Sequence, residues 1–165
     1  MSSLKAVFTG NKKLTLAVAE SITCGHLQTR IGKISGASEF FLGGVTAYTL
    51  EQKVNLLGLD KETAEIVNCV SGQVAEAMAE GVCRLFNSDV GCATTGYAEP
   101  SQAYHIKDAY AFWAVAVRRA DSSFYTINGR VDLAGMSRIS AQETCAAAAE
   151  LAIIAITEKA SELRS

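Results

Sequence analysis

The sequence predicts a three-layer α/β/α sandwich around a mixed, mostly parallel sheet of about five strands. In the first half of the 165-residue chain, short apolar runs alternate with segments of helical composition, which is typical of parallel strands joined by helices. Two β-rich runs around a turn then precede a long Ala-rich segment, which indicates a hairpin followed by a last helix. We find no internal repeat or linker, so residues 1–165 are expected to form a single domain.

Each element follows from a local pattern of apolar residues, glycines and capping residues. Strands are expected over residues 14–19, 40–49, 90–95, 109–117 and 123–133, and helices over residues 26–31, 53–57, 72–86 and 140–163. The helix at 72–86 has the clearest pattern, because Val74, Met78 and Val82 recur at helical spacing behind Ser71 as the N-cap. Ser140 and Glu143 form a possible capping box for the last helix.

Composition excludes several classes of protein. Hydrophobic residues make up 49% of the chain, charged residues only 19%, and Pro100 is the only proline, which excludes a disordered chain. A net charge of −2 carries no electrostatic footprint for nucleic acid. The longest apolar run, from Ala146 to Ile156, contains Glu150 and is shorter than the ~20 residues of a membrane helix. The N-terminal residues show no signal core. We therefore expect a cytoplasmic domain without nucleic-acid or membrane partners.

Cysteine and histidine usage argues against a metal site. The five cysteines are widely spaced and form no CxxC motif, and the two histidines, His26 and His105, are far apart. An odd number of cysteines in this pattern favours neither a disulfide framework nor a structural zinc site. Metal catalysis is therefore not expected from these residues.

Two turns are candidates for chemistry, because ligands of open α/β sheets gather at the carboxyl ends of strands. The first is the segment 20–25 (ESITCG) and the second is the segment 94–100 (TTGYAEP). Local composition by itself favours simpler roles: helix capping for Ser21 and Thr23, a solvated charge for Lys53, and a strand-end aromatic that reaches the surface for Tyr48.

Four motifs taken together resemble the CinA C-terminal domain family. They are AESITCG, GGVTAYTLEQKVNLLGL, VSGQVAEAMAEG and TTGYAEP, in an order and spacing close to those of the family. The similarity extends over roughly residues 14–155. The chain resembles the stand-alone form of the family, without the additional N-terminal domain that many members carry. Members include the nicotinamide mononucleotide deamidases called PncC.

The resemblance implies hydrolysis of the carboxamide of nicotinamide mononucleotide, a pyridine nucleotide, to nicotinic acid mononucleotide and ammonia. By the same resemblance, Ser21 is the nucleophile and is assisted by Tyr48 and Lys53. Backbone N–H groups around Thr23 to Gly25 are expected to stabilise the oxyanion. The resemblance also implies a homo-oligomer and a reaction that needs no metal and no organic cofactor. The residues expected to contact the substrate are Glu20, Thr23, Cys24, Gly25, Thr95, Gly96 and Arg138.

Several positions depart from the family motifs. Cys24 stands where the family has glycine, and it is the alternative nucleophile because a thiol at a helix N-terminus can ionise more easily. Tyr97 and Glu99 replace an isoleucine and a glycine of the TGIAGP loop. Glu99 either turns away from the pocket, or pairs with a base such as Lys107, or indicates a less anionic ligand. Arg138 either replaces the family arginine of a GDR segment from a shifted position or is a surface charge.

These departures leave two functions open. One is an active amidohydrolase on nicotinamide mononucleotide or a related pyridine nucleotide, supported by Ser21, Tyr48 and Lys53 occurring together. The other is a diverged paralogue with lost or altered activity that binds a small molecule or nucleotide.

Overall fold

The fold is built on one five-stranded mixed sheet in the order β2-β1-β3-β4-β5. This computed structural model describes residues 3–10 and 13–163. The strands are β1 (Leu16–Glu20), β2 (Phe41–Thr46), β3 (Val90–Tyr97), β4 (Tyr110–Arg118) and β5 (Phe124–Asp132). β1 pairs in parallel with β2 and β3, whereas β4 pairs antiparallel with both β3 and β5. Only β4 therefore runs against the other four strands, and the prediction of a mixed, mostly parallel sheet is confirmed.

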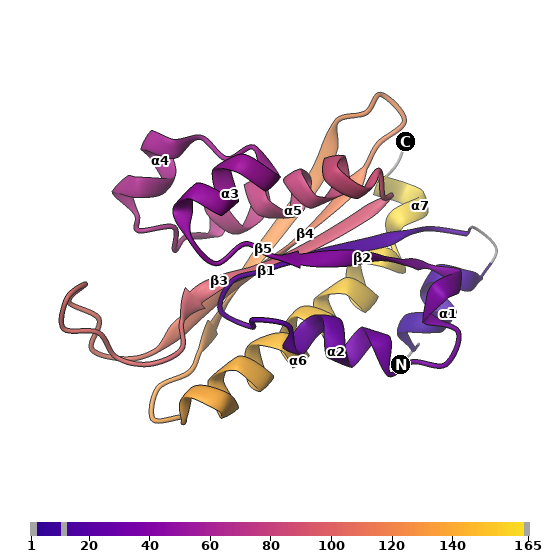
Figure 1. Cartoon of the computed structure of the whole chain (residues 1–165). Helices are drawn as coiled ribbons and strands as arrows, with labels where there is room; N and C mark the ends of the chain where they lie inside the picture. Colours follow the sequence, from indigo (N-terminus) through magenta and orange to yellow (C-terminus); the bar gives the residue numbers. More distant parts are fainter. Residues whose placement is uncertain (1–2, 11–12, 164–165) are drawn as a thin grey trace.

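Helices cover both faces of the sheet and complete the three layers (Figure 1). On one face lie α3 (Leu50–Leu57), α4 (Lys61–Ile66) and α5 (Gly72–Phe86); on the other lie α1 (Leu4–Thr9), α2 (His26–Gly32), α6 (Arg138–Thr157) and α7 (Ala160–Leu163). Successive side chains of β1 alternate between these layers: Leu16 and Val18 pack into the core under α6, Ala17 and Ala19 into the core under α5. β1 is thus buried on both faces, as expected of a strand in a parallel sheet.

α5 positions α3, the helix that carries Lys53. The predicted helix at 72–86 is confirmed at both ends, and the Ser71 hydroxyl accepts a hydrogen bond from the Val74 N–H at 3.1 Å. Gly81 lets the two helices approach closely, because a Cβ there would lie 2.2 Å from the Leu57 carbonyl oxygen. α3 is therefore held directly against α5.

The last helix differs from the prediction at both ends. Its N-cap is Ser137, whose hydroxyl accepts from the Ser140 N–H at 3.2 Å, so the expected Ser140–Glu143 capping box is wrong. The helix ends at Thr157 and is followed by the separate turn of α7. By length and composition α6 would qualify as a membrane span. One side of it packs on the sheet and on α1 and α2, while Ile139 and Leu151 are exposed.

Three short elements lie outside the predicted set. They are α1, α4 and the single turn η1 (Ala37–Glu39), and each has six residues or fewer. α3 also begins three residues before the predicted start, because Thr49 caps it by accepting from the Gln52 N–H. This earlier start makes Lys53 the fourth residue of the helix and not the first.

Candidate active site

Ser21 lies at the carboxyl edge of the parallel strands, immediately after β1. Its backbone N–H donates to the Thr94 carbonyl of β3 at 3.0 Å, and the Ala47 N–H beyond β2 donates to the Glu20 carbonyl at 2.9 Å. The ends of β2, β1 and β3 are thereby tied side by side. Because parallel strands end at the same edge, residues that follow each of them surround Ser21.

Lys53 reaches this edge from α3. Its Nζ lies 3.0 Å from Ser21 Oγ and donates to the Tyr48 backbone carbonyl at 2.9 Å. The side chain is only 2% exposed, so the solvated charge favoured by local composition is wrong. Burial lowers the pKa of Lys53, and the neighbouring Cys69 thiol acts in the opposite direction. Both hydrogen-bonding partners are uncharged oxygens, so they only partly replace the lost hydration of an ammonium.

The Ser21–Lys53 contact has the geometry of a nucleophile with its proton acceptor. A serine hydroxyl attacks a carbonyl carbon only when an adjacent base removes its proton. Lowering the pKa of a lysine increases its fraction of neutral amine, which has one lone pair and two N–H groups. The Tyr48 carbonyl binds one N–H, and this contact orients Nζ with respect to Ser21.

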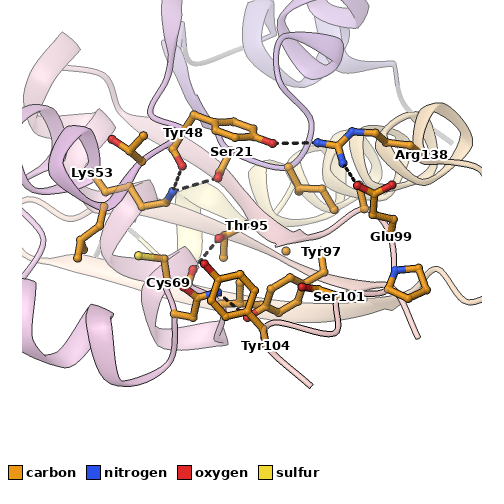
Figure 2. A pocket seen from close by; sticks show the side chains of 18 residues that line it. Ser21, Tyr48, Lys53, Cys69, Thr95, Tyr97, Glu99, Ser101, Tyr104 and Arg138 are labelled. Carbon is orange, nitrogen blue, oxygen red and sulfur yellow. Dashed lines mark hydrogen bonds and ion pairs between the residues drawn. The ribbon is translucent and has the colours of Figure 1, made fainter. Parts of the chain in front are cut away.

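Arg138 joins two sides of the rim. Its Nη2 donates to the Tyr48 hydroxyl at 3.0 Å, and its Nη1 is 2.5 Å from Glu99 Oε1 (Figure 2). Tyr48 is half exposed, as expected for a strand-end aromatic. Of the three alternatives for Glu99, the structure shows pairing with a base. The base is Arg138 and not Lys107.

A pocket of about 540 Å³ opens in front of Ser21. Figure 2 shows Tyr48 and Arg138 on one side of it and Tyr97 and Tyr104 on the other. The lining residues are Ser21, Ile22, Tyr48, Thr49, Leu50, Lys53, Asn68, Cys69, Val70, Thr95, Gly96, Tyr97, Ala98, Glu99, Pro100, Ser101, Tyr104 and Arg138. Six predicted site residues are thus brought together, namely Ser21, Tyr48, Lys53, Thr95, Gly96 and Arg138.

The segment between α4 and α5 supplies a wall that the sequence did not predict. Asn68 and Cys69 are consecutive residues with left-handed backbone, at φ 47° and 60°. Asn68 Nδ2 donates to the Tyr97 hydroxyl at 2.9 Å, and the Cys69 carbonyl accepts from Thr95 Oγ1 at 2.6 Å. Burial raises the pKa of the Cys69 thiol, with Lys53 acting against it. Only the asparagine, which tolerates this conformation, gave a local signal.

Glu20 is buried beside the pocket, and its hydrogen bonds hold the start of α2. Its carboxylate accepts hydrogen bonds from the N–H groups of Gly25 and Leu27 at 3.0 Å and of Gln28 at 2.8 Å. These are groups that a helix leaves unpaired at its N-terminus. Glu20 therefore caps α2 from within and is not among the lining residues.

Thr23, Cys24 and Gly25 also lie outside the lining of the pocket. Thr23 Oγ1 is hydrogen-bonded to Thr94 Oγ1 at 2.7 Å, and the Cys24 side chain is exposed. The Cys24 N–H donates to the Ser21 carbonyl and the Gly25 N–H to Glu20. These two N–H groups are thus occupied within the turn, which contradicts the expectation that they are available to an oxyanion. Within the described parts of the chain, no group of three acidic, histidine or cysteine side chains could hold a metal ion.

Fold and site together define the class of protein: a mixed α/β domain that buries a lysine against a serine hydroxyl at the carboxyl edge of its parallel strands. The chain belongs to the CinA C-terminal domain family, whose sequence profile matches residues 3–155. This match confirms the family that the motifs indicate.

Curated relatives and solved structures agree with this assignment. A competence-damage inducible protein of Thermoanaerobacter sp. (strain X514) is 49% identical over 89 residues, which is 54% of this chain and 22% of the relative. The CinA-like protein of Leptospira biflexa is 43% identical over 89 residues, 54% of this chain and 21% of the relative. The chain thus matches about a fifth of the length of these relatives.

Two crystal structures share the fold. The CinA superfamily protein of Enterobacter cloacae superposes with a TM-score of 0.80 at 22% identity, covering 93% of this chain and 88% of that one. The competence damage-inducible protein A of Klebsiella pneumoniae superposes with a TM-score of 0.77 at 24% identity, covering 95% of this chain and 91% of that one. At these identities the likeness concerns the fold alone.

Proposed function

We propose that this chain is an amidohydrolase that releases ammonia from the carboxamide of nicotinamide mononucleotide or a related pyridine compound. The observation that carries the proposal is the 3.0 Å contact between Lys53 Nζ and Ser21 Oγ at the floor of an open pocket. A buried lysine beside a serine hydroxyl is a costly arrangement, and strongly perturbed groups of this kind cluster at functional sites. The choice of substrate follows the family resemblance.

In the first half-reaction, neutral Lys53 takes the proton of Ser21 Oγ as the oxygen attacks the carboxamide carbon. The tetrahedral intermediate then expels the amide nitrogen, which leaves as ammonia with the proton that Lys53 returns. Breaking the C–N bond leaves the acid esterified to Ser21. In the second half-reaction, Lys53 deprotonates a water that attacks this ester, and Ser21 Oγ leaves and regains the proton. The carboxylic acid is the second product.

The pocket suits a flat aromatic amide. Tyr97 and Tyr104 lie with ring centroids 6.1 Å apart on the wall facing Tyr48, and aromatic side chains bind flat rings by offset or edge contacts. Asn68 fixes the Tyr97 ring through its hydroxyl. A cavity of about 540 Å³ falls within the range of small-molecule sites.

A second candidate is a binding protein without hydrolysis, which one observation favours. Glu99 forms an ion pair with Arg138, the arginine best placed to hold an anionic ligand. Glu99 stands where the family motif has glycine. A diverged pocket of this kind is expected to bind a small molecule while turning over nicotinamide mononucleotide poorly or not at all.

Ammonia release from a panel of pyridine nucleotides and free nicotinamide tests the proposal. We expect activity on at least one compound, its loss in Ser21→Ala, and an ester on Ser21 in mass spectra of quenched reactions. Ser38→Ala is the matched control, since it removes an exposed hydroxyl of η1 that lies outside the pocket lining. Activity that survives Ser21→Ala would move the nucleophile to another side chain, with the Cys69 thiol as the alternative inside the pocket. No activity on any compound would favour the binding protein.

A further inference from the structure

We infer that the pocket selects against a phosphate, so that an N-ribosyl pyridinium carboxamide is hydrolysed in preference to its phosphorylated form. The inference rests on the proposed amide hydrolysis and specifies its substrate class. It starts from the charges that line the pocket. Two lining residues are basic, Lys53 and Arg138, and Glu99 is the acidic one.

Lys53 is poorly placed to hold an anionic ligand. Its Nζ is held between Ser21 Oγ and the Tyr48 carbonyl, and burial favours its neutral form. A phosphate beside Lys53 would favour the charged form of this lysine, which opposes its use as a base. The only other cation of the lining is Arg138.

Arg138 is already engaged by neighbours on both sides. One terminal nitrogen contacts Glu99 and the other donates to the Tyr48 hydroxyl. An arginine binds phosphate best by presenting two parallel N–H groups to two oxygens. Two of the five guanidinium N–H groups are taken here, and a phosphate that bound the others would lie beside the Glu99 carboxylate. Arg138 and Glu99 together therefore add no net charge to the rim.

The aromatic walls favour a ligand of the opposite sign. Tyr48, Tyr97 and Tyr104 line the pocket, and Tyr97 is fixed by Asn68 and by an edge contact with Tyr110 at 5.5 Å. The faces of tyrosine rings attract cations. A pyridine ring that carries ribose on its nitrogen has a positive charge, whereas a phosphate adds up to two negative ones. Pocket and ring are thus complementary without the phosphate.

The experiment compares kcat/KM for nicotinamide riboside and nicotinamide mononucleotide at one ionic strength. We expect the riboside to be preferred about tenfold, an effect limited in size because Arg138 and Glu99 are 46% and 60% exposed and screened by solvent. Glu99→Gln frees Arg138 and is expected to shift the ratio about tenfold toward the mononucleotide. Glu158→Gln is the matched control, because it makes the same charge change at the exposed far end of α6 and should leave the ratio unchanged.

Binding to the Ser21→Ala variant separates this inference from the proposed reaction. In titration calorimetry we expect the riboside to bind more tightly than the mononucleotide, whether or not the wild type hydrolyses either. Selective binding without ammonia release would refute the hydrolysis and keep the selectivity. Tighter or equal binding of the mononucleotide, binding of neither compound, or an unchanged ratio in Glu99→Gln would overturn the inference.

Discussion

Glu20 and Lys53 are both buried, both ionisable and both next to the Ser21 turn, yet the fold satisfies their charges to very different degrees. The Glu20 carboxylate accepts three backbone N–H groups at the start of α2. The Lys53 ammonium has one carbonyl and one hydroxyl, neither of them charged. Three backbone donors thus bind the Glu20 carboxylate, whereas burial lowers the pKa of Lys53.

The difference separates a charge that serves the fold from one suited to the proposed reaction. A carboxylate that accepts three backbone N–H groups contributes to stability. A lysine that is short of partners can take up or release a proton cheaply, which a base requires and which makes it costly to the fold. Residue type and burial alone would have treated the two positions alike; their hydrogen-bonding partners distinguish them.

The largest expected effect is on catalysis by Lys53. With the amidase active, Lys53→Met should lower kcat by about 10³–10⁴-fold, because Ser21 loses its proton acceptor. The wild-type rate should rise with pH through the lowered pKa of Lys53, and the variant should lack this rise. Ammonia release across a pH series measures both, with Lys61→Met on α4 as the exposed control. A variant that keeps the same pH profile would assign the titration to another group.

The next effect concerns stability. Glu20→Ala leaves the three N–H groups of α2 without their acceptor in a buried place, and we expect a loss of about 4 kcal/mol. This corresponds to a fall in Tm of roughly 10 °C for a chain of this size. Thermal unfolding followed by circular dichroism measures it, and Glu158→Ala should cost little. A loss under about 1 kcal/mol would show that water replaces the carboxylate, and the contrast between the two charges would weaken.

Lys53→Met should change stability in the opposite direction. We expect the free energy of unfolding to rise by about 1 kcal/mol near neutral pH, or Tm to rise by roughly 2–4 °C. Because the pKa of Lys53 is lower in the folded than in the unfolded chain, the unfolded chain binds the proton more tightly. Wild-type stability therefore rises with pH between the lowered pKa and 10.5.

The advantage of Lys53→Met should accordingly be largest at low pH and shrink as the pH approaches 10.5. Chemical denaturation at several pH values follows this trend, and Lys159→Met provides an exposed comparison. A destabilised variant would mean that the contacts of Lys53 outweigh the cost of burying it.

The smallest effect lies in the turn that Glu20 supports. Cys24 has φ 43°, a left-handed conformation that costs a residue with a Cβ about 1–2 kcal/mol. Cys24→Gly removes this strain but increases the freedom of the unfolded chain, so we expect a net gain of about 0.5 kcal/mol. Activity should be unchanged, since the thiol lies outside the pocket. Loss of activity in this variant, with folding intact, would restore Cys24 as a functional residue.

Regular elements could be predicted because their signals are local. α5 carries its own N-cap at Ser71 and an apolar stripe, and the strands are bounded by turns, so their positions follow from neighbours in sequence. The start of α6 shows the limit: Ser137 and Ser140 are both capping residues three positions apart, and only the backbone conformation decides between them.

The candidate site was predictable only in part, because its contacts are long-range. Ser21, Tyr48 and Lys53 came from the family resemblance, whereas local composition made Lys53 a surface charge. Its burial depends on how α3 docks against α5, which no local pattern reports. The Glu99–Arg138 pair joins residues 39 positions apart, and the capping role of Glu20 required the path of the chain after Ser21.

The hydrogen bond from Arg138 to Tyr48 bears on the order in which contacts of the site form during synthesis. The Ser21–Lys53 contact closes 32 residues of chain, whereas Arg138 and Tyr48 are 90 residues apart. Closing the longer loop costs more chain entropy, and α6 is synthesised after all five strands. The reacting pair can therefore come together while the wall that Arg138 braces is still missing. During synthesis, the Ser21–Lys53 contact is therefore expected to form before the bond between Arg138 and Tyr48.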